Sequence, residues 1–168
     1  MDVPARARVA SAPAATKAGL LATLVLVGAG LVFFEPARAG VYLLLLTALF
    51  LVRVAGQLVV VSRSPAWLPP MEQWNFVPYR ILLPIQVVLL TAMAAGGQLV
   101  LGGVRPGPGL GAAFVWCSVA YWAAMGVRYA RRMSAHPDQR WFGGAIPIVF
   151  HCVLAAYLFV LGSSGAAS

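Results

Sequence analysis

Charged residues are scarce in this chain, and acidic residues are the scarcest of all. Only 10% of the 168 residues are charged and four are Asp or Glu, whereas 61% are hydrophobic. Soluble domains carry about 25% charged residues, so a water-soluble globule could not hide this much apolar surface. No Asp or Glu lies in the middle of an apolar run. That absence argues against a proton-driven pump, because such pumps hold carboxylates inside the membrane.

Residues that usually carry enzyme chemistry are also few. The two cysteines, Cys117 and Cys152, lie inside apolar runs, so we expect small packing residues rather than a disulfide framework. The sequence has no H-E-x-x-H, P-loop or G-x-G-x-x-G motif. Only His151 lies in an apolar run, which excludes haem held by two membrane histidines. Catalytic residues and cofactors therefore stay unassigned, and no metal site is predicted.

Long apolar runs dominate what is present. Each of five runs falls within the roughly 17–25 residues that cross a bilayer as a helix. We therefore predict an all-α integral membrane protein, a bundle of five transmembrane helices in the cell (inner or plasma) membrane. The predicted spans lie at about residues 18–34, 41–61, 80–101, 110–127 and 145–162. Residues 1–17 are expected to form a disordered cytoplasmic tail, and residues 163–168 a short outer tail.

The connection between the first two runs leaves two alternatives open. It is only six residues long, from Glu35 to Gly40, so it could be a break within one longer segment. The protein would then have four spans. The basic start, the first apolar run and the small residues around Ala37 and Ala39 also fit a signal peptide, in which case residues 1–39 would be cleaved.

Basic residues alternate between the two sides of the predicted membrane. The first, third and fifth non-membrane segments hold nine of them, and the second, fourth and sixth hold two. The nine are Arg6, Arg8, Lys17, Arg63, Arg80, Arg128, Arg131, Arg132 and Arg140. By the positive-inside rule, the N-terminus is cytoplasmic and the C-terminus is outside. The net charge of +8 therefore indicates anionic membrane lipid at the cytoplasmic face, and no nucleic acid partner is expected.

Four polar residues in four different spans lie at one depth. Counting about 1.5 Å per residue from the cytoplasmic ends places Arg53, Gln86, Tyr121 and His151 on the order of 10 Å inside the membrane, with Gln57 one turn from Arg53. Polar residues inside a membrane usually face the bundle interior. These side chains are candidates for a ligand pocket near the cytoplasmic leaflet. The alternative is that Arg53 extends its charge to the interface and the others join helices.

The two cytoplasmic loops carry a second group of candidates. Arginine can hold an anion, and carboxylate or imidazole groups can act as acid or base, so these loops could bind a lipid headgroup or phosphate. The same charges could instead serve only to orient the protein and to touch anionic lipid. The loop candidates are Glu72, Arg131, Arg132, His136, Asp138 and Arg140.

Three functions remain open from the sequence. The favoured one is an accessory or structural subunit of a membrane complex that binds other membrane proteins or a second copy of itself. Small residues on several spans, such as Ala92, Gly96 and Gly97, would let helices approach closely. The alternative is a protein or enzyme that binds a lipid or cofactor in the polar pocket. A small oligomeric transporter is the third.

Overall fold

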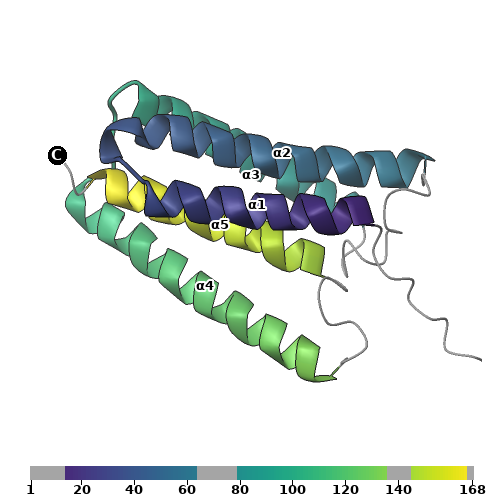
Figure 1. The fold of residues 1–168 in the computed structure, drawn as a ribbon. Helices are drawn as coiled ribbons and strands as arrows, with labels where there is room; N and C mark the ends of the chain where they lie inside the picture. The colour runs from purple at the N-terminus through teal and green to yellow at the C-terminus, as the bar shows by residue number, and fades with distance from the viewer. Residues whose placement is uncertain (1–13, 64–78, 136–144, 166–168) are drawn as a thin grey trace, which may run out of the picture.

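The computed structural model describes residues 14–63, 79–135 and 145–165, and these residues form helices and short turns without a strand. The helices are α1 (Ala14–Val32), a short 3-10 turn η1 (Pro36–Arg38), α2 (Ala39–Arg63), α3 (Tyr79–Leu101), α4 (Pro108–Ala135) and α5 (Ala145–Ser164). The predicted helical bundle is confirmed at this level. Successive helices run in opposite directions (Figure 1).

Proline and glycine set the helix ends. Pro36 opens η1 directly before α2, and Pro108 is the first residue of α4, where a missing N–H costs nothing. Gly103 lies two residues beyond the last residue of α3 and has a φ of 89°. The N–H of Val104 bonds to Leu99 O, and that of Gly103 bonds to Val100 O. This is a Schellman motif, which requires a left-handed residue and therefore favours glycine.

Two helix bounds differ by more than two residues from those expected. Helix α1 begins at Ala14, inside the segment predicted as a tail. Helix α4 continues past Val127 to Ala135, so Arg128 and Arg131 lie on a helix rather than in a loop. No proline or glycine interrupts the sequence between Val127 and Ala135, and its Arg, Ala and Met residues favour helix.

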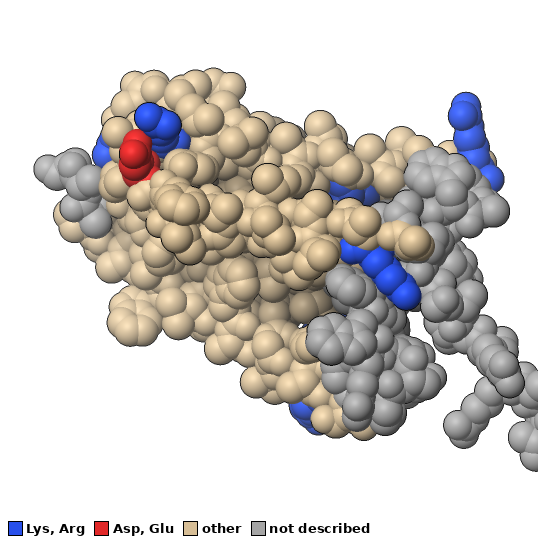
Figure 2. All heavy atoms as spheres, in the orientation of Figure 1, with Lys and Arg blue, Asp and Glu red and all other residues tan. Residues whose placement is uncertain are grey.

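Four helices are long and apolar enough to cross a membrane. They comprise Pro36–Arg63, Arg80–Leu101, Pro108–Arg131 and Pro147–Ser164, while the apolar part of α1, Lys17–Val32, is shorter. The described residues therefore form four or five long apolar helices, which are compatible with a multi-pass membrane protein. Figure 2 shows the visible charged side chains toward the two ends of the molecule, with an uncharged surface between them.

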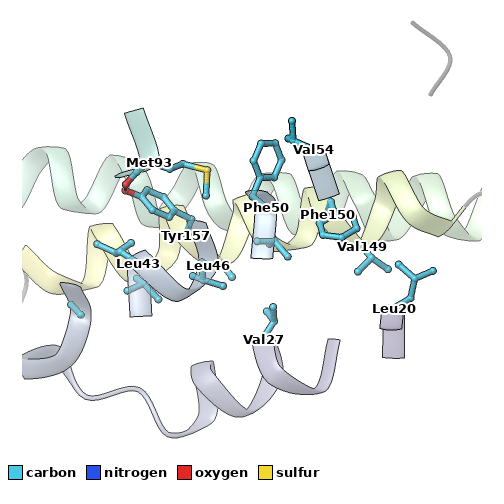
Figure 3. Close-up of a cluster of buried hydrophobic side chains, with 14 of the residues drawn as sticks. Leu20, Val27, Leu43, Leu46, Phe50, Val54, Met93, Val149, Phe150 and Tyr157 are labelled. Atoms are coloured by element: carbon cyan, nitrogen blue, oxygen red, sulfur yellow. The ribbon is translucent and has the colours of Figure 1, made fainter. Parts of the chain in front are cut away.

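Helix α5 lies at the centre of the bundle. It packs against α1, α2, α3 and α4, and 61% of its apolar window is buried, against 11% for α4. Figure 3 shows Phe150 and Tyr157 of α5 among Leu43, Phe50 and Met93 of the neighbouring helices. Helix α4 packs against α5, whereas it diverges from α1, α2 and α3 (Figure 1).

The crossing of α4 and α5 explains this divergence. A Cβ on Gly162 would lie 2.5 Å from Gly111 O, and a Cβ on Gly111 would lie 2.8 Å from Gly162 O. Two glycines therefore bring the start of α4 against the end of α5. Further along, Ser118 donates a hydrogen bond to Ala155 O at 2.7 Å. Toward its C-terminal end, α4 then moves away from the rest of the bundle (Figure 1).

The two ends of the bundle differ in charge. At one end α1, α3 and α5 begin and α2 and α4 end (Figure 1). We call it the basic end, because it carries Lys17, Arg63, Arg80, Arg128 and Arg131. The opposite end holds an exposed ion pair between Glu35 and Arg38 at 3.0 Å. There Arg105 donates a hydrogen bond to Ser164 O at 3.0 Å, which caps the last carbonyls of α5.

Candidate functional site

Three of the predicted polar residues form a hydrogen-bonded group inside the bundle. Gln86 Nε2 of α3 donates to Gln57 Oε1 of α2 at 2.8 Å. The same oxygen accepts a hydrogen bond from Arg53 Nη1 at 3.3 Å. All three side chains are buried, with Arg53 only 6% exposed and Gln57 fully covered. Arg53 and Gln57 are four residues apart and therefore lie on one face of α2. The Gln57 amide can thus accept hydrogen bonds from both Arg53 and Gln86.

Aromatic rings surround the guanidinium group of Arg53. Its Cζ lies 5.7 Å from the centroid of the Phe50 ring and 5.6 Å from that of Phe150. Both distances are within the range of cation–π attraction, which strengthens when the cation is removed from water. The Arg53 side chain is therefore held between α2 and α5.

Two amide atoms beside Arg53 have no hydrogen-bond partner among the described residues. They are the donor Gln57 Nε2 and the acceptor Gln86 Oε1, both fully buried. Rotating the Gln57 amide by half a turn would place an N–H group toward Arg53, which has only donors. The Arg53 bond therefore fixes the orientation of Gln57 and leaves one donor and one acceptor for another group.

The other two predicted residues form a separate pair between α4 and α5. The Tyr121 hydroxyl and His151 Nδ1 lie 2.5 Å apart, and the two rings meet edge to face with centroids 5.6 Å apart. His151 follows Phe150 in α5, so the residue that faces Arg53 and the residue that faces Tyr121 are adjacent. The predicted polar layer is thus divided into two hydrogen-bonded groups on neighbouring sides of α5.

The predicted loop candidates are only partly described. Arg131 is exposed on the last turns of α4 at the basic end. The backbone of Arg132 lies in the same helix, but its side chain is outside the described residues, as are Glu72, His136, Asp138 and Arg140. Their proposed role in binding a headgroup therefore stays a prediction.

A groove between α3 and α4 was not predicted. The groove has a volume of about 440 Å³, and its lining residues lie on α3 and α5 except for Tyr121 of α4. Its lining is apolar except for two tyrosines, and comprises Leu89, Ala92, Met93, Gly96, Tyr121, Leu154, Tyr157, Leu158 and Leu161. The Tyr157 hydroxyl is already used, because it donates to Met93 O at 2.7 Å. No sequence pattern marks this groove, since it depends on the angle between α4 and α5.

A second cavity, of about 490 Å³, lies between α1 and α2 and is lined by aliphatic and aromatic side chains together with Ala29, Gly30, Ala48 and Ala156. It contains no charged group. Among the described residues, no cluster of three His, Cys, Asp or Glu side chains could hold a metal ion.

Comparison with protein-family models, with curated proteins and with solved structures finds no match to this chain. Its class rests on the fold, which is that of a helical bundle with the dimensions of a multi-pass membrane protein.

Proposed function

We propose that the protein is an accessory subunit that binds another integral membrane protein through α4. The observation that carries this proposal is the outer face of α4. Ala113, Cys117, Ala120 and Ala124 recur at helical spacing and are all exposed. Small residues let a neighbouring helix approach closely, and they are enriched where membrane helices pack together.

The contrast with the other helices supports this reading. The exposed faces of α2 and α3 carry large apolar residues such as Leu51, Val52, Ile85 and Val88, which suit contact with lipid tails. On α4, Phe114, Trp122 and Met125 are partly or fully buried, and the exposed face combines the small residues with the large residues Trp116, Val119 and Val127. A partner helix can approach closely where the small residues lie.

Photo-cross-linking tests the partner. We would introduce p-benzoylphenylalanine at Ala120, and at Val88 on the exposed face of α3 as a control, and irradiate native membranes. We expect a discrete protein adduct from position 120 and none from position 88. The same partner should co-purify with the unmodified protein and be lost in Ala120→Leu, because a larger side chain prevents close helix approach.

Two results would overturn the accessory role. Only lipid adducts at position 120 would mean that α4 faces lipid. An adduct with a second copy of this chain would mean self-association instead of a subunit of a larger complex.

The topology we propose has five spans with the N-terminus in the cytoplasm and the C-terminus outside. It is supported by the charge of the basic end, where α1, α2, α3 and α4 carry Lys17, Arg63, Arg80, Arg128 and Arg131, against the two basic residues Arg38 and Arg105 at the opposite end. The positive-inside rule places the basic end in the cytoplasm. Anionic lipid headgroups in the cell membrane are the partners expected for those side chains.

A second candidate function is favoured by the two buried amides. Gln57 Nε2 and Gln86 Oε1 offer one donor and one acceptor to a lipid or cofactor in a polar pocket near the cytoplasmic side. A native mass spectrum after gentle extraction tests this candidate. A stoichiometric small molecule that disappears in Gln86→Leu would support it, and a bare chain would contradict it.

A further inference from the structure

The groove between α3 and α4 combines an apolar surface with one polar pair at its side. Along α3 the groove extends from Leu89 to Gly96, and along α5 from Leu154 to Leu161, a length of about 10 Å at the helical rise. Its volume of about 440 Å³ is within the range of small-molecule sites. Apolar cavities stay dry but accept apolar ligands, so water is a poor occupant for most of it.

The Tyr121–His151 pair always retains an unused donor. If Tyr121 donates to Nδ1, the proton of His151 lies on Nε2. If Nδ1 donates to the phenol oxygen, the Tyr121 O–H is free to donate elsewhere. Tyr121 lines the groove, and no described residue other than His151 bonds its hydroxyl. His151 does not line the groove, so the donor that a carbonyl in the groove can use is the Tyr121 O–H, in the arrangement where His151 Nδ1 donates to the phenol oxygen.

The depth of Tyr121 in the bundle determines which kind of lipid head group can bind beside it. Tyr121 lies near the middle of α4, and the rest of the groove runs from it toward the end opposite the basic end. A phospholipid that used the Tyr121 donor would have to place its charged head in the hydrocarbon region, which is costly, and no described residue lining the groove is charged. A neutral head group can occupy this depth without that penalty.

The aromatic side chains that line the groove favour a flat head group. Tyr121 of α4 and Tyr157 of α5 both line the cavity, and flat rings pack well against a planar conjugated group. Ester carbonyls on a flexible glycerol do not use such walls. A planar ring bearing carbonyl oxygens and an apolar tail fits all three features, namely the donor, the depth and the walls.

We propose that the groove between α3 and α4 binds a neutral lipid of the prenylquinone class, with a ring carbonyl accepting a hydrogen bond from Tyr121 and the tail lying along α3 and α5. His151 positions the phenol by bonding its oxygen. This site is separate from the outer face of α4 that we propose for a protein partner, and also from the buried amides Gln57 and Gln86, which do not line the groove.

Native mass spectrometry of the full-length protein tests the site, with a decyl-substituted benzoquinone as the probe and decylbenzene as the matched compound without carbonyls. We expect one saturable adduct with the quinone and a much weaker one with decylbenzene. Tyr121→Phe removes only the hydroxyl and should weaken quinone binding by about three- to tenfold, the usual effect of one hydrogen bond. Tyr129→Phe, in the same helix, should leave it unchanged.

A second experiment fills the groove with a larger side chain to test whether the ligand binds there. Ala92→Phe places a ring in the cavity from an exposed position and should abolish the adduct. Ala95→Phe adds the same ring to α3 at an exposed residue outside the groove and should preserve it. Cross-linking at position 120 should be the same in Ala92→Phe as in the wild type, so failure of this site is distinguishable from failure of the accessory role.

Three outcomes would overturn the proposal. Equal binding of quinone by the wild type, Tyr121→Phe and Ala92→Phe would show that the adduct lies elsewhere. Equal binding of decylbenzene would show that the carbonyl is not recognised. A dimer that Ala92→Phe dissociates would show that a second copy of the chain fills the groove.

Discussion

The hydrogen bonds at Gln57 give the sharpest test of how this bundle is held together. Gln57 is fully buried and accepts two hydrogen bonds, one from Gln86 of α3 at 2.8 Å and one from Arg53 of its own helix at 3.3 Å. Leucine has a similar size, so Gln57→Leu removes both bonds and leaves little cavity. It also leaves the amide of Gln86 buried without this partner.

The expected cost follows from the two bonds. Hydrogen bonds between side chains in membrane helices contribute about 0.6 kcal/mol on average and at most about 1.7 kcal/mol. The bond from Arg53 is charged and shielded from water, which strengthens it, although it is long. We therefore expect Gln57→Leu to lower the free energy of unfolding by about 2 kcal/mol.

A double-mutant cycle measures the coupling. Gln86→Leu should cost about 1 kcal/mol, since it breaks the bond between the two amides. The double variant should cost about 1 kcal/mol less than the sum of the single variants, because no amide is left unpaired. Unfolding in mixed micelles at increasing fractions of sodium dodecyl sulfate gives these values. Gln98→Leu, at an exposed position of α3, is the control and should change stability by less than about 0.5 kcal/mol.

Additive costs in the cycle would refute the reasoning, as would a Gln57→Leu variant as stable as Gln98→Leu. Either result would mean that the amides do not bond each other within the folded bundle.

Three further predictions concern packing and topology. Gly162→Ala should lower the free energy of unfolding by about 1–3 kcal/mol, because its Cβ would lie 2.5 Å from Gly111 O; Gly109→Ala, with nothing within 4 Å of its Cβ, should have little effect in the same assay. Tyr157→Phe should cost about 1 kcal/mol, because Met93 O loses the donated hydrogen bond, whereas Tyr42→Phe, whose bond to Phe33 O is exposed, should cost less. In a cysteine-free background, a membrane-impermeant maleimide added from outside should label cysteines at Glu35 and Gly107 but not at Lys17 or Arg63, and external labelling at Lys17 would show that α1 does not span the membrane.

The helical architecture was predictable because it depends on local properties. Long apolar runs bounded by Pro36, by Gly102 and Gly103, and by Pro108 leave little alternative to helices in a bilayer. The end of α4 was harder to predict. Hydropathy falls at Arg128, but nothing in the chain stops the helix there, and so the helix continues past the apolar run to Ala135.

The polar residues were predictable in depth but not in direction. Counting residues from the helix ends is enough to place Arg53, Gln86, Tyr121 and His151 at a similar level. Which of them meet depends on how each helix is rotated. Because adjacent residues of α5 point to different neighbours, Phe150 faces Arg53 while His151 faces Tyr121, and one expected layer becomes two groups.

The angle of α4 depends on contacts that no single helix reveals. Gly111 lies near the start of α4 and Gly162 near the end of α5, so they are far apart in the sequence. Only the packing of the two helices shows that a glycine is needed at both positions. This contact and those of Ser118 with Ala155 and Tyr121 with His151 hold α4 to α5 along most of α5, while no comparable packing joins α4 to α3 along the described residues. The groove lined by Tyr121 and Tyr157 and the outward-facing alanines of α4 both result from that arrangement. A side chain at Gly162 should therefore perturb ligand binding and partner binding together, whereas Ala92→Phe and Ala120→Leu should separate them.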